Sequence, residues 1–130
     1  MNEKFTLCWN DLPGAPENGC LLARLDDIVD GGARLLSLGS GAASFGVILL
    51  RSGDSVLAYV NRCAHFGVPL ASKVEHLYLK PHESLTCSVH YARYRWQDGA
   101  CIKGDCEGEF LLKIPVTVID GNIVIACKSN

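Results

Sequence analysis

The sequence predicts an all-β protein, and two observations carry that prediction. Short apolar or β-branched runs follow one another along the chain, and most are separated by turn signals rich in Gly, Ser or Asp. No segment keeps apolar residues at the spacing i, i+3, i+4 and i+7 that an amphipathic helix needs. Many short strands at short intervals are typical of a β-sandwich or a β-barrel.

The first strands are expected after an irregular lead-in. Residues 1–20 contain Pro13, Gly14, Pro16 and Gly19, which disfavour regular structure. A short apolar stretch follows, and it ends in acidic residues and a glycine turn. Strands are then expected at residues 34–38, 45–50, 55–60, 74–79 and 84–87.

The last part of the chain has the clearest pattern. Apart from Lys113, residues 110–114, 116–119 and 123–126 are apolar or β-branched, and Asp120-Gly121 lies between the last two runs. An Asp-Gly pair between β-branched runs is a strong signal for a tight hairpin. The sequence therefore predicts an antiparallel hairpin close to the end of the chain.

Length and composition fit one domain and exclude several classes of protein. The chain has 130 residues, of which 48% are hydrophobic and 20% charged, enough to bury a core. The net charge is −2 and no run of Lys and Arg is present, so we expect no nucleic-acid partner. The N-terminus lacks a signal-peptide pattern, and the longest apolar run, residues 45–50, is too short to span a bilayer. We therefore expect a cytoplasmic protein with no membrane partner.

The seven cysteines suggest metal binding or buried thiols, because disulfides are rare in a reducing compartment. Cys101 and Cys106 are expected to be structural thiols, and a disulfide between them is the less favoured alternative. His76 and His82 have no cysteine nearby in sequence and are expected to be surface or turn residues.

Two short motifs carry the chemistry. Cys63 and His65 form a Cys-x-His pair, and Cys87 and His90 form a Cys-x-x-His pair. Two thiolates and two imidazoles on two loops can bind a single metal ion or an iron–sulfur cluster. A structural zinc site with the same four ligands is therefore an alternative to a cluster. Iron would colour the protein, whereas zinc would not.

These motifs resemble the two ligand boxes of the Rieske family. The first box reads CAHFGVPL and fits C-x-H-x-G-x-x-L, and the second begins CSVHYARYRWQDG. The second box also has an aromatic residue at Tyr94 and a turn at Gly99. The resemblance extends from about residue 21 to residue 126. One departure is Tyr91, which follows the second histidine where the family usually has Gly, a residue that tolerates a positive φ.

The resemblance implies a fold, a cofactor and a ligand set. The fold is an antiparallel β-sandwich with a small inserted cluster-binding subdomain, and the chain forms one Rieske domain. The subdomain is expected at residues 61–99. The cofactor is one [2Fe–2S] cluster per chain. Cys63 and Cys87 are implied to bind one iron, and His65 and His90 the outer iron.

By the same resemblance the protein is a one-electron carrier, a Rieske ferredoxin between a reductase and a terminal oxygenase. It is not expected to be an enzyme by itself, because 130 residues leave no room for a second, catalytic domain. A small redox or regulatory subunit of a reductase complex is an alternative, as is the structural zinc module. Arg62, Arg93 and Arg95 flank the ligand boxes, either as a positive rim for an acidic partner or, by default, as solvated surface charges.

Overall fold

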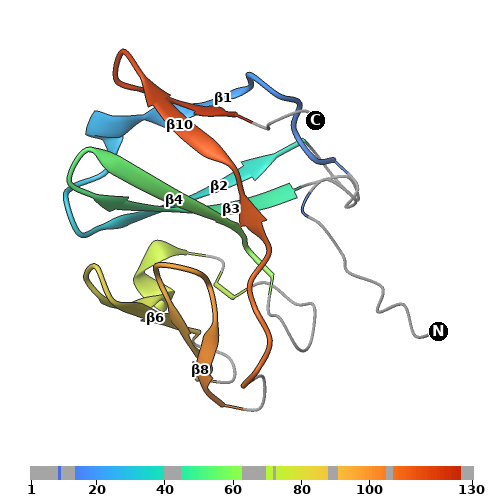
Figure 1. Ribbon diagram of the computed structural model, residues 1–130, viewed down its shortest axis with the longest axis vertical. Helices are drawn as coiled ribbons and strands as arrows, with labels where there is room; N and C mark the ends of the chain where they lie inside the picture. Colours follow the sequence, from blue (N-terminus) through green and yellow to red (C-terminus); the bar gives the residue numbers. More distant parts are fainter. Residues whose placement is uncertain are drawn as a thin grey trace.

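The computed structural model describes residues 9, 14–39, 45–62, 70–71, 73–87, 91–104 and 107–126, and it confirms the all-β prediction. All strand pairs are antiparallel, and they form three sheets (Figure 1). Over the described residues the only helical elements are single 3₁₀ turns, such as Leu25–Asp27 and Val74–His76. None of the described residues belongs to a helix long and apolar enough to cross a membrane.

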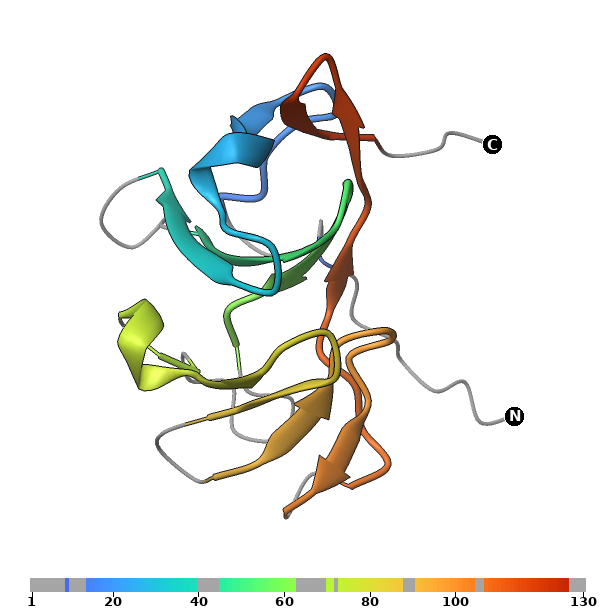
Figure 2. The same cartoon turned by 90° about the vertical axis from the view of Figure 1, so that its left-hand side faces the viewer.

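The three sheets follow one another from one end of the molecule to the other (Figures 1 and 2). The first sheet, of three strands, has the order β1 (Leu21–Arg24), β11 (Asn122–Ile125), β10 (Val116–Ile119). The middle sheet, of four strands, has the order β2 (Ala33–Leu38), β3 (Phe45–Ser52), β4 (Ser55–Val60), β9 (Lys113–Ile114). The small sheet, also of four strands, has the order β5 (Tyr78–Lys80), β6 (Ser84–Thr86), β7 (Arg93–Arg95), β8 (Cys101–Lys103).

Strand β3 explains why the apolar run at residues 45–50 is continuous. Val47 and Leu49 belong to the core between the first and middle sheets, whereas Ile48 and Leu50 belong to the core shared with the small sheet. All four side chains are completely buried. Because successive side chains of a strand point to opposite faces, a strand covered on both faces must be apolar throughout. The middle sheet therefore serves two cores.

The predicted Asp-Gly hairpin is confirmed. Ile119 of β10 pairs with Asn122 of β11, which leaves Asp120 and Gly121 as a two-residue loop. Both loop residues have positive φ, 52° and 79°, as a type I′ turn requires. This turn matches the twist of the two strands, and Gly121 adopts the left-handed conformation without the steric cost of a Cβ.

The small sheet differs most from the expected pattern. Residues 74–79, predicted as one strand, form a 3₁₀ turn at Val74–His76 followed by β5. Strands β7 and β8 were not predicted, since each has only three residues and carries charged side chains. Their outward residues are charged except Ile102, and only the middle residue of β7, Tyr94, is completely buried. Three residues are too few for an alternation of polar and apolar side chains to be distinctive.

Tyr59 of β4 connects the middle sheet to the small sheet. Its hydroxyl donates a hydrogen bond to the carbonyl oxygen of Trp96, and Trp96 donates its indole N–H to the carbonyl of Ser84 at 2.9 Å. Burial raises the pKa of the Tyr59 phenol well above its usual range, and the Asp98 charge adds to that shift. Gly99 packs against the same ring, because a Cβ there would lie 2.8 Å from Tyr59 Cε1.

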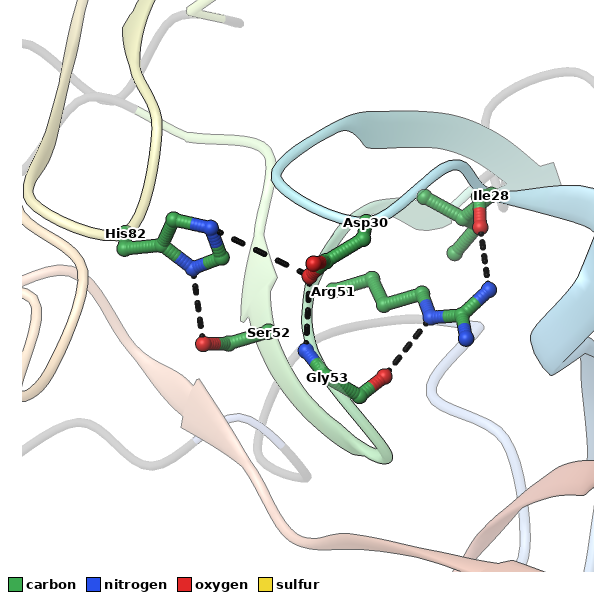
Figure 3. A network of polar contacts seen from close by, with 6 residues as sticks. All are labelled: Ile28, Asp30, Arg51, Ser52, Gly53 and His82. Atoms are coloured by element: carbon green, nitrogen blue, oxygen red, sulfur yellow. Dashed lines mark hydrogen bonds and ion pairs between the residues drawn. The ribbon is translucent and has the colours of Figure 1, made fainter.

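His82 makes a second connection, at the tip of the β5–β6 turn (Figure 3). Its Nδ1 and the Ser52 Oγ are hydrogen-bonded at 2.8 Å, and its Nε2 lies 3.9 Å from a carboxylate oxygen of Asp30. Asp30 in turn accepts the backbone N–H of Gly53 at 2.7 Å. The imidazole also contacts the Trp96 ring, with the centroids 5.7 Å apart. His82 is thus a turn histidine, as predicted, and it bridges the small sheet and the β3–β4 hairpin.

Candidate metal centre

Cys87 is the predicted ligand whose surroundings the structure describes. It directly follows β6, it is completely buried, and it is not in a disulfide. Its backbone N–H donates to the carbonyl of Ala92 at 2.9 Å, so these two residues are held together at the ends of the second ligand segment. Cys63, His65 and His90 lie outside the described residues. A buried cysteine outside any disulfide is suited to binding iron as a thiolate.

Asn61 closes the first ligand loop with its side chain. Its Nδ2 donates to the carbonyl of Ala71 at 2.8 Å, and its Oδ1 accepts the backbone N–H of Leu70 at 2.8 Å. The same oxygen lies 3.4 Å from the N–H of Ala71. Asn61 stands two residues before Cys63 and binds the residues at the far end of the CAHFGVPL box. One amide therefore holds the two ends of that box together.

The ends of the two ligand boxes meet in one buried cluster. Leu70, which ends the first box, and Ala71 after it pack in the same hydrophobic core as Cys87 and Ala92, which bound the second loop. The ring of Tyr94 belongs to this core too and is completely buried. The fold therefore brings together the described ends of the two segments that carry the predicted ligands. Within the described residues, no group of three or more His, Cys, Asp or Glu side chains is arranged to hold a metal ion.

Gly104 packs closely against Ala92 at the end of the second ligand loop, and the sequence analysis did not identify it. Its φ is +113°, and a Cβ there would lie 3.1 Å from the Ala92 Cα and 3.3 Å from the Ala92 Cβ. Ala92 accepts the hydrogen bond of Cys87, so this close approach positions the loop. A glycine shortly after a charged three-residue strand is the only sequence signal, and it does not specify a contact with residue 92.

Tyr91 has a positive φ, the backbone conformation for which the Rieske motif usually has Gly. Its φ is +56°, in the left-handed region, and its side chain is 64% exposed. A residue with a Cβ is strained in this region by about 1–2 kcal/mol. The position thus requires the conformation that Gly adopts freely, and Tyr91 adopts it in spite of the strain.

An exposed ion pair fixes the turn between β7 and β8. Arg95 donates from Nε and Nη2 to the two carboxylate oxygens of Asp98, at 3.0 and 2.7 Å. Asp98 also accepts the backbone N–H of Ala100 at 3.0 Å. The hydrogen bonds from Arg95, followed by that from Ala100, lower the pKa of Asp98 from 3.8 to about 2. The ion pair holds the turn that contains Gly99.

The expectation that Cys101 is a thiol is wrong, because Cys101 is disulfide-bonded. Neither Cys20 nor Cys87 is in a disulfide, so the partner of Cys101 lies among the cysteines outside the described residues, which include Cys106. The expectation rested on the reducing compartment and on Glu109, which stands where the third cysteine of an all-cysteine plant-type cluster would be. Burial of Cys101 at 5% exposure, opposite Tyr94 in the register of the sheet, does not distinguish a thiol from a disulfide.

A family model decides the nature of the centre. The model of the Rieske [2Fe–2S] domain matches residues 23–125. The chain belongs to the Rieske family. Membership implies a [2Fe–2S] cluster rather than the zinc ion of the alternative interpretation. Cys87, buried and outside any disulfide, shares an apolar core with Leu70 and Ala71 and fits this group.

Solved structures share the fold of this Rieske domain. The ferredoxin of carbazole 1,9a-dioxygenase from Nocardioides aromaticivorans IC177 is 24% identical with a TM-score of 0.63, covering 86% of this chain and 100% of that chain. A chain in the complex of reduced oxygenase and oxidized ferredoxin in carbazole 1,9a-dioxygenase is 17% identical with a TM-score of 0.68. The match covers 88% of this chain and 98% of that chain. The terminal oxygenase of carbazole 1,9a-dioxygenase from Novosphingobium sp. KA1 is 19% identical with a TM-score of 0.69. That match covers 86% of this chain but 31% of that chain. The search of the curated proteins finds no match.

Proposed function

We propose that this Rieske protein is a one-electron carrier, a ferredoxin that takes electrons from a reductase and passes them to a terminal oxygenase. The family match over residues 23–125 is the observation that carries the proposal, because it implies a redox-active cluster. Similarity to a ferredoxin over 100% of that chain, against 31% of the oxygenase chain, supports a carrier rather than a catalytic subunit. The free thiol of Cys20 suits the reducing cytoplasm, where the disulfide of Cys101 would be unusual.

The ligand set belongs to the same proposal. Cys63 and Cys87 bind the inner iron, and His65 and His90 bind the outer iron, within a cluster-binding subdomain that begins near residue 61. Two neutral imidazoles in place of two thiolates raise the reduction potential of the cluster relative to an all-cysteine cluster. The protein's own residues hold the loops in place: Asn61 closes the first loop, and the Cys87–Ala92 hydrogen bond closes the second.

The ligand assignment is tested by replacing single residues in the full chain. His65→Ala, His90→Ala and Cys87→Ser are each expected to abolish most of the bound iron, the visible absorbance and the EPR signal of the dithionite-reduced protein. Cys20→Ser is the matched control, because Cys20 is a free thiol far from the ligand loops in sequence, and it should keep all three signals. An unchanged spectrum in His65→Ala and His90→Ala would show that the histidines are not ligands.

The carrier function is tested separately from the ligands. The reduced protein should transfer one electron per chain to an acceptor and be reduced again by a reductase without loss of the cluster. A loaded protein that takes up and returns no electron reversibly would contradict the proposal.

A further inference from the structure

Four basic side chains share the outer face of the small sheet. Arg93 and Arg95 alternate with the buried residues Ala92, Tyr94 and Trp96. Across the sheet, Ser84 pairs with Lys80 on one side and with Arg95 on the other. Lys103 is paired with Arg93 across β7 and β8. Residues that pair directly in an antiparallel sheet project from the same face. The basic residues therefore lie on one surface, opposite the face that carries Leu85 and Tyr94 into the core.

The charges on this outer face are not equally neutralised. Lys80 lies 3.3 Å from a carboxylate oxygen of Glu83, and Arg95 is bound by Asp98. Within the described part of the chain, Arg93 and Lys103 form no ion pair. The positive charge is therefore concentrated at the end of the sheet where β7 follows the second ligand loop.

The described acidic residues near β8 lie outside this register. The backbone carbonyl of Glu109 accepts the N–H of Cys101, whose side chain faces the buried side of the sheet, and Glu107 is in the turn after β8. Exposed carboxylates of the other two sheets are at their turns, at Asp26, Asp27, Asp54 and Asp120. In a chain of net charge −2, a positive face close to the ligand loop is a local feature and not a consequence of composition.

The same surface has a shape and apolar groups that suit a protein partner. An open hollow of about 340 Å³ is lined by Arg93 and Ile102, with buried Ser84 among its walls. Ile102 is 45% exposed, and strained Tyr91 is exposed two residues before Arg93. Tyr and Arg are enriched among the residues that dominate protein interfaces. Strain retained in an exposed aromatic residue is the kind of outlier that points to function.

We propose that Tyr91, Arg93, Ile102 and Lys103 form a docking surface for an acidic face of a redox partner protein. This inference rests on the proposed carrier function and names the chemistry of one partner. Two cations with no ion pair to a described residue, beside two exposed apolar groups, fit a small, transient protein interface, in which charge steers the encounter and a limited apolar area keeps its lifetime short. A polyanion such as nucleic acid would require a longer basic track.

The surface is tested with the cluster-loaded full chain and a labelled oligoglutamate peptide as the acidic probe. Fluorescence anisotropy at low ionic strength should show binding that disappears at high salt, since exposed charges are screened. The double variant Arg93→Glu/Lys103→Glu should bind about tenfold more weakly. The control Arg34→Glu/Lys113→Glu makes the same change in net charge on exposed residues of the middle sheet, and it should lose less than about threefold.

Each other outcome of the binding test overturns the proposal. Equal losses in both double variants would show that net charge governs binding and not this face. Phosphatidylserine vesicles or a single-stranded oligonucleotide bound more tightly than the peptide, through Arg93 and Lys103, would show that the surface serves a lipid or a nucleic acid instead.

Electron transfer to small complexes gives a second readout. Oxidation of the reduced cluster by the anion ferricyanide should slow as salt increases, although repulsion from a net charge of −2 predicts the opposite. Arg93→Glu/Lys103→Glu should reverse that salt dependence, and hexaammineruthenium(III), a cation, should respond in the opposite sense. A wild-type rate that rises with salt overturns the docking surface. A chain without a reducible cluster would overturn the carrier function and leave the peptide result standing.

Discussion

The first two sheets and the small sheet are built by different means. The first two sheets use strands of up to eight residues, a shared core that is mostly aliphatic and a regular type I′ hairpin at Asp120-Gly121. The strands of the small sheet have three residues each. Its loops are fixed by side chains that bind backbone groups and by close approaches at Gly99 and Gly104.

Strain follows the same division. Among the described residues other than glycine, positive φ occurs at Asp120 in the predicted hairpin, and at His82 and Tyr91 in the turns of the small sheet. His82 occupies the third position of a turn in which Glu83 donates to the carbonyl of Lys80, a position that favours Gly. The part of the molecule that carries the ligand loops thus relies on individual contacts, and it should be the more sensitive to single substitutions.

The largest effect should come from Gly99→Ala. The φ of +74° is strained for alanine, and the new Cβ would meet Tyr59 Cε1 at 2.8 Å and Leu111 Cβ at 3.3 Å. Left-handed strain and overpacking together should lower the free energy of unfolding by about 3 kcal/mol. The midpoint of thermal unfolding should fall by roughly 10 °C.

Gly53→Ala is the matched control for Gly99→Ala. Its φ is +64°, but nothing lies within 4 Å of the added Cβ. It should cost only the backbone strain, about 1 kcal/mol. Equal losses in the two variants would show that contact with Tyr59 adds nothing at the junction of the middle and small sheets.

A smaller effect is expected from Asn61→Ala. The change removes the bonds to Leu70 and Ala71 and leaves partly buried backbone groups unpaired, which should cost about 2 kcal/mol. The cluster should also be lost faster to a chelator, because the first ligand loop is no longer closed. Loss of visible absorbance with time measures this effect.

Asn61→Asp separates the two halves of the Asn61 clamp. Aspartate keeps the oxygen that accepts the N–H of Leu70 but cannot donate to the carbonyl of Ala71. Its rate of cluster loss should lie between those of the wild type and Asn61→Ala. If Asn61→Ala loses its cluster at the same rate as the wild type, the hydrogen bonds of Asn61 do not stabilise the first ligand loop.

Tyr91 offers a test in the opposite direction, in which a substitution relieves strain. Tyr91→Gly should be more stable than Tyr91→Ala by about 1 kcal/mol, because alanine keeps the left-handed strain while glycine removes it. Both variants lose the same exposed ring, so the comparison isolates the backbone. Thermal unfolding of the two variants under identical conditions measures the difference, and a more stable alanine variant would refute the strain.

The sequence predicted the first two sheets better than the small sheet for a physical reason. Residues 45–50 and the Asp120-Gly121 pair carry patterns that depend only on local sequence. The contacts of Asn61 with Leu70, of Gly104 with Ala92 and of His82 with Ser52 join separate segments, and no local pattern encodes them. Cys87 was identified by its spacing to His90, whereas the residues that position it were not.

The smallest effect concerns the exposed ion pair of Arg95 and Asp98 at the end of the small sheet. The pKa of Asp98 is lowered to about 2 in the folded protein, against 3.8 ordinarily. A lowered folded pKa stabilises the protein above the unfolded value, and that stabilisation is lost as the pH falls through the folded value. Asp98→Asn should therefore be slightly less stable than the wild type above pH 4 and equal to it near pH 2.

The first two sheets supply the control, because Asp54→Asn replaces an exposed carboxylate for which the structure shows no ion pair among the described residues. Thermal midpoints between these limits of pH measure the difference for each variant. An exposed ion pair contributes little to stability, so the test depends on how the difference in thermal midpoint between the wild type and Asp98→Asn changes with pH. The difference should disappear on acidification, and a difference independent of pH would show that Asp98 does not contribute to the acid dependence of stability.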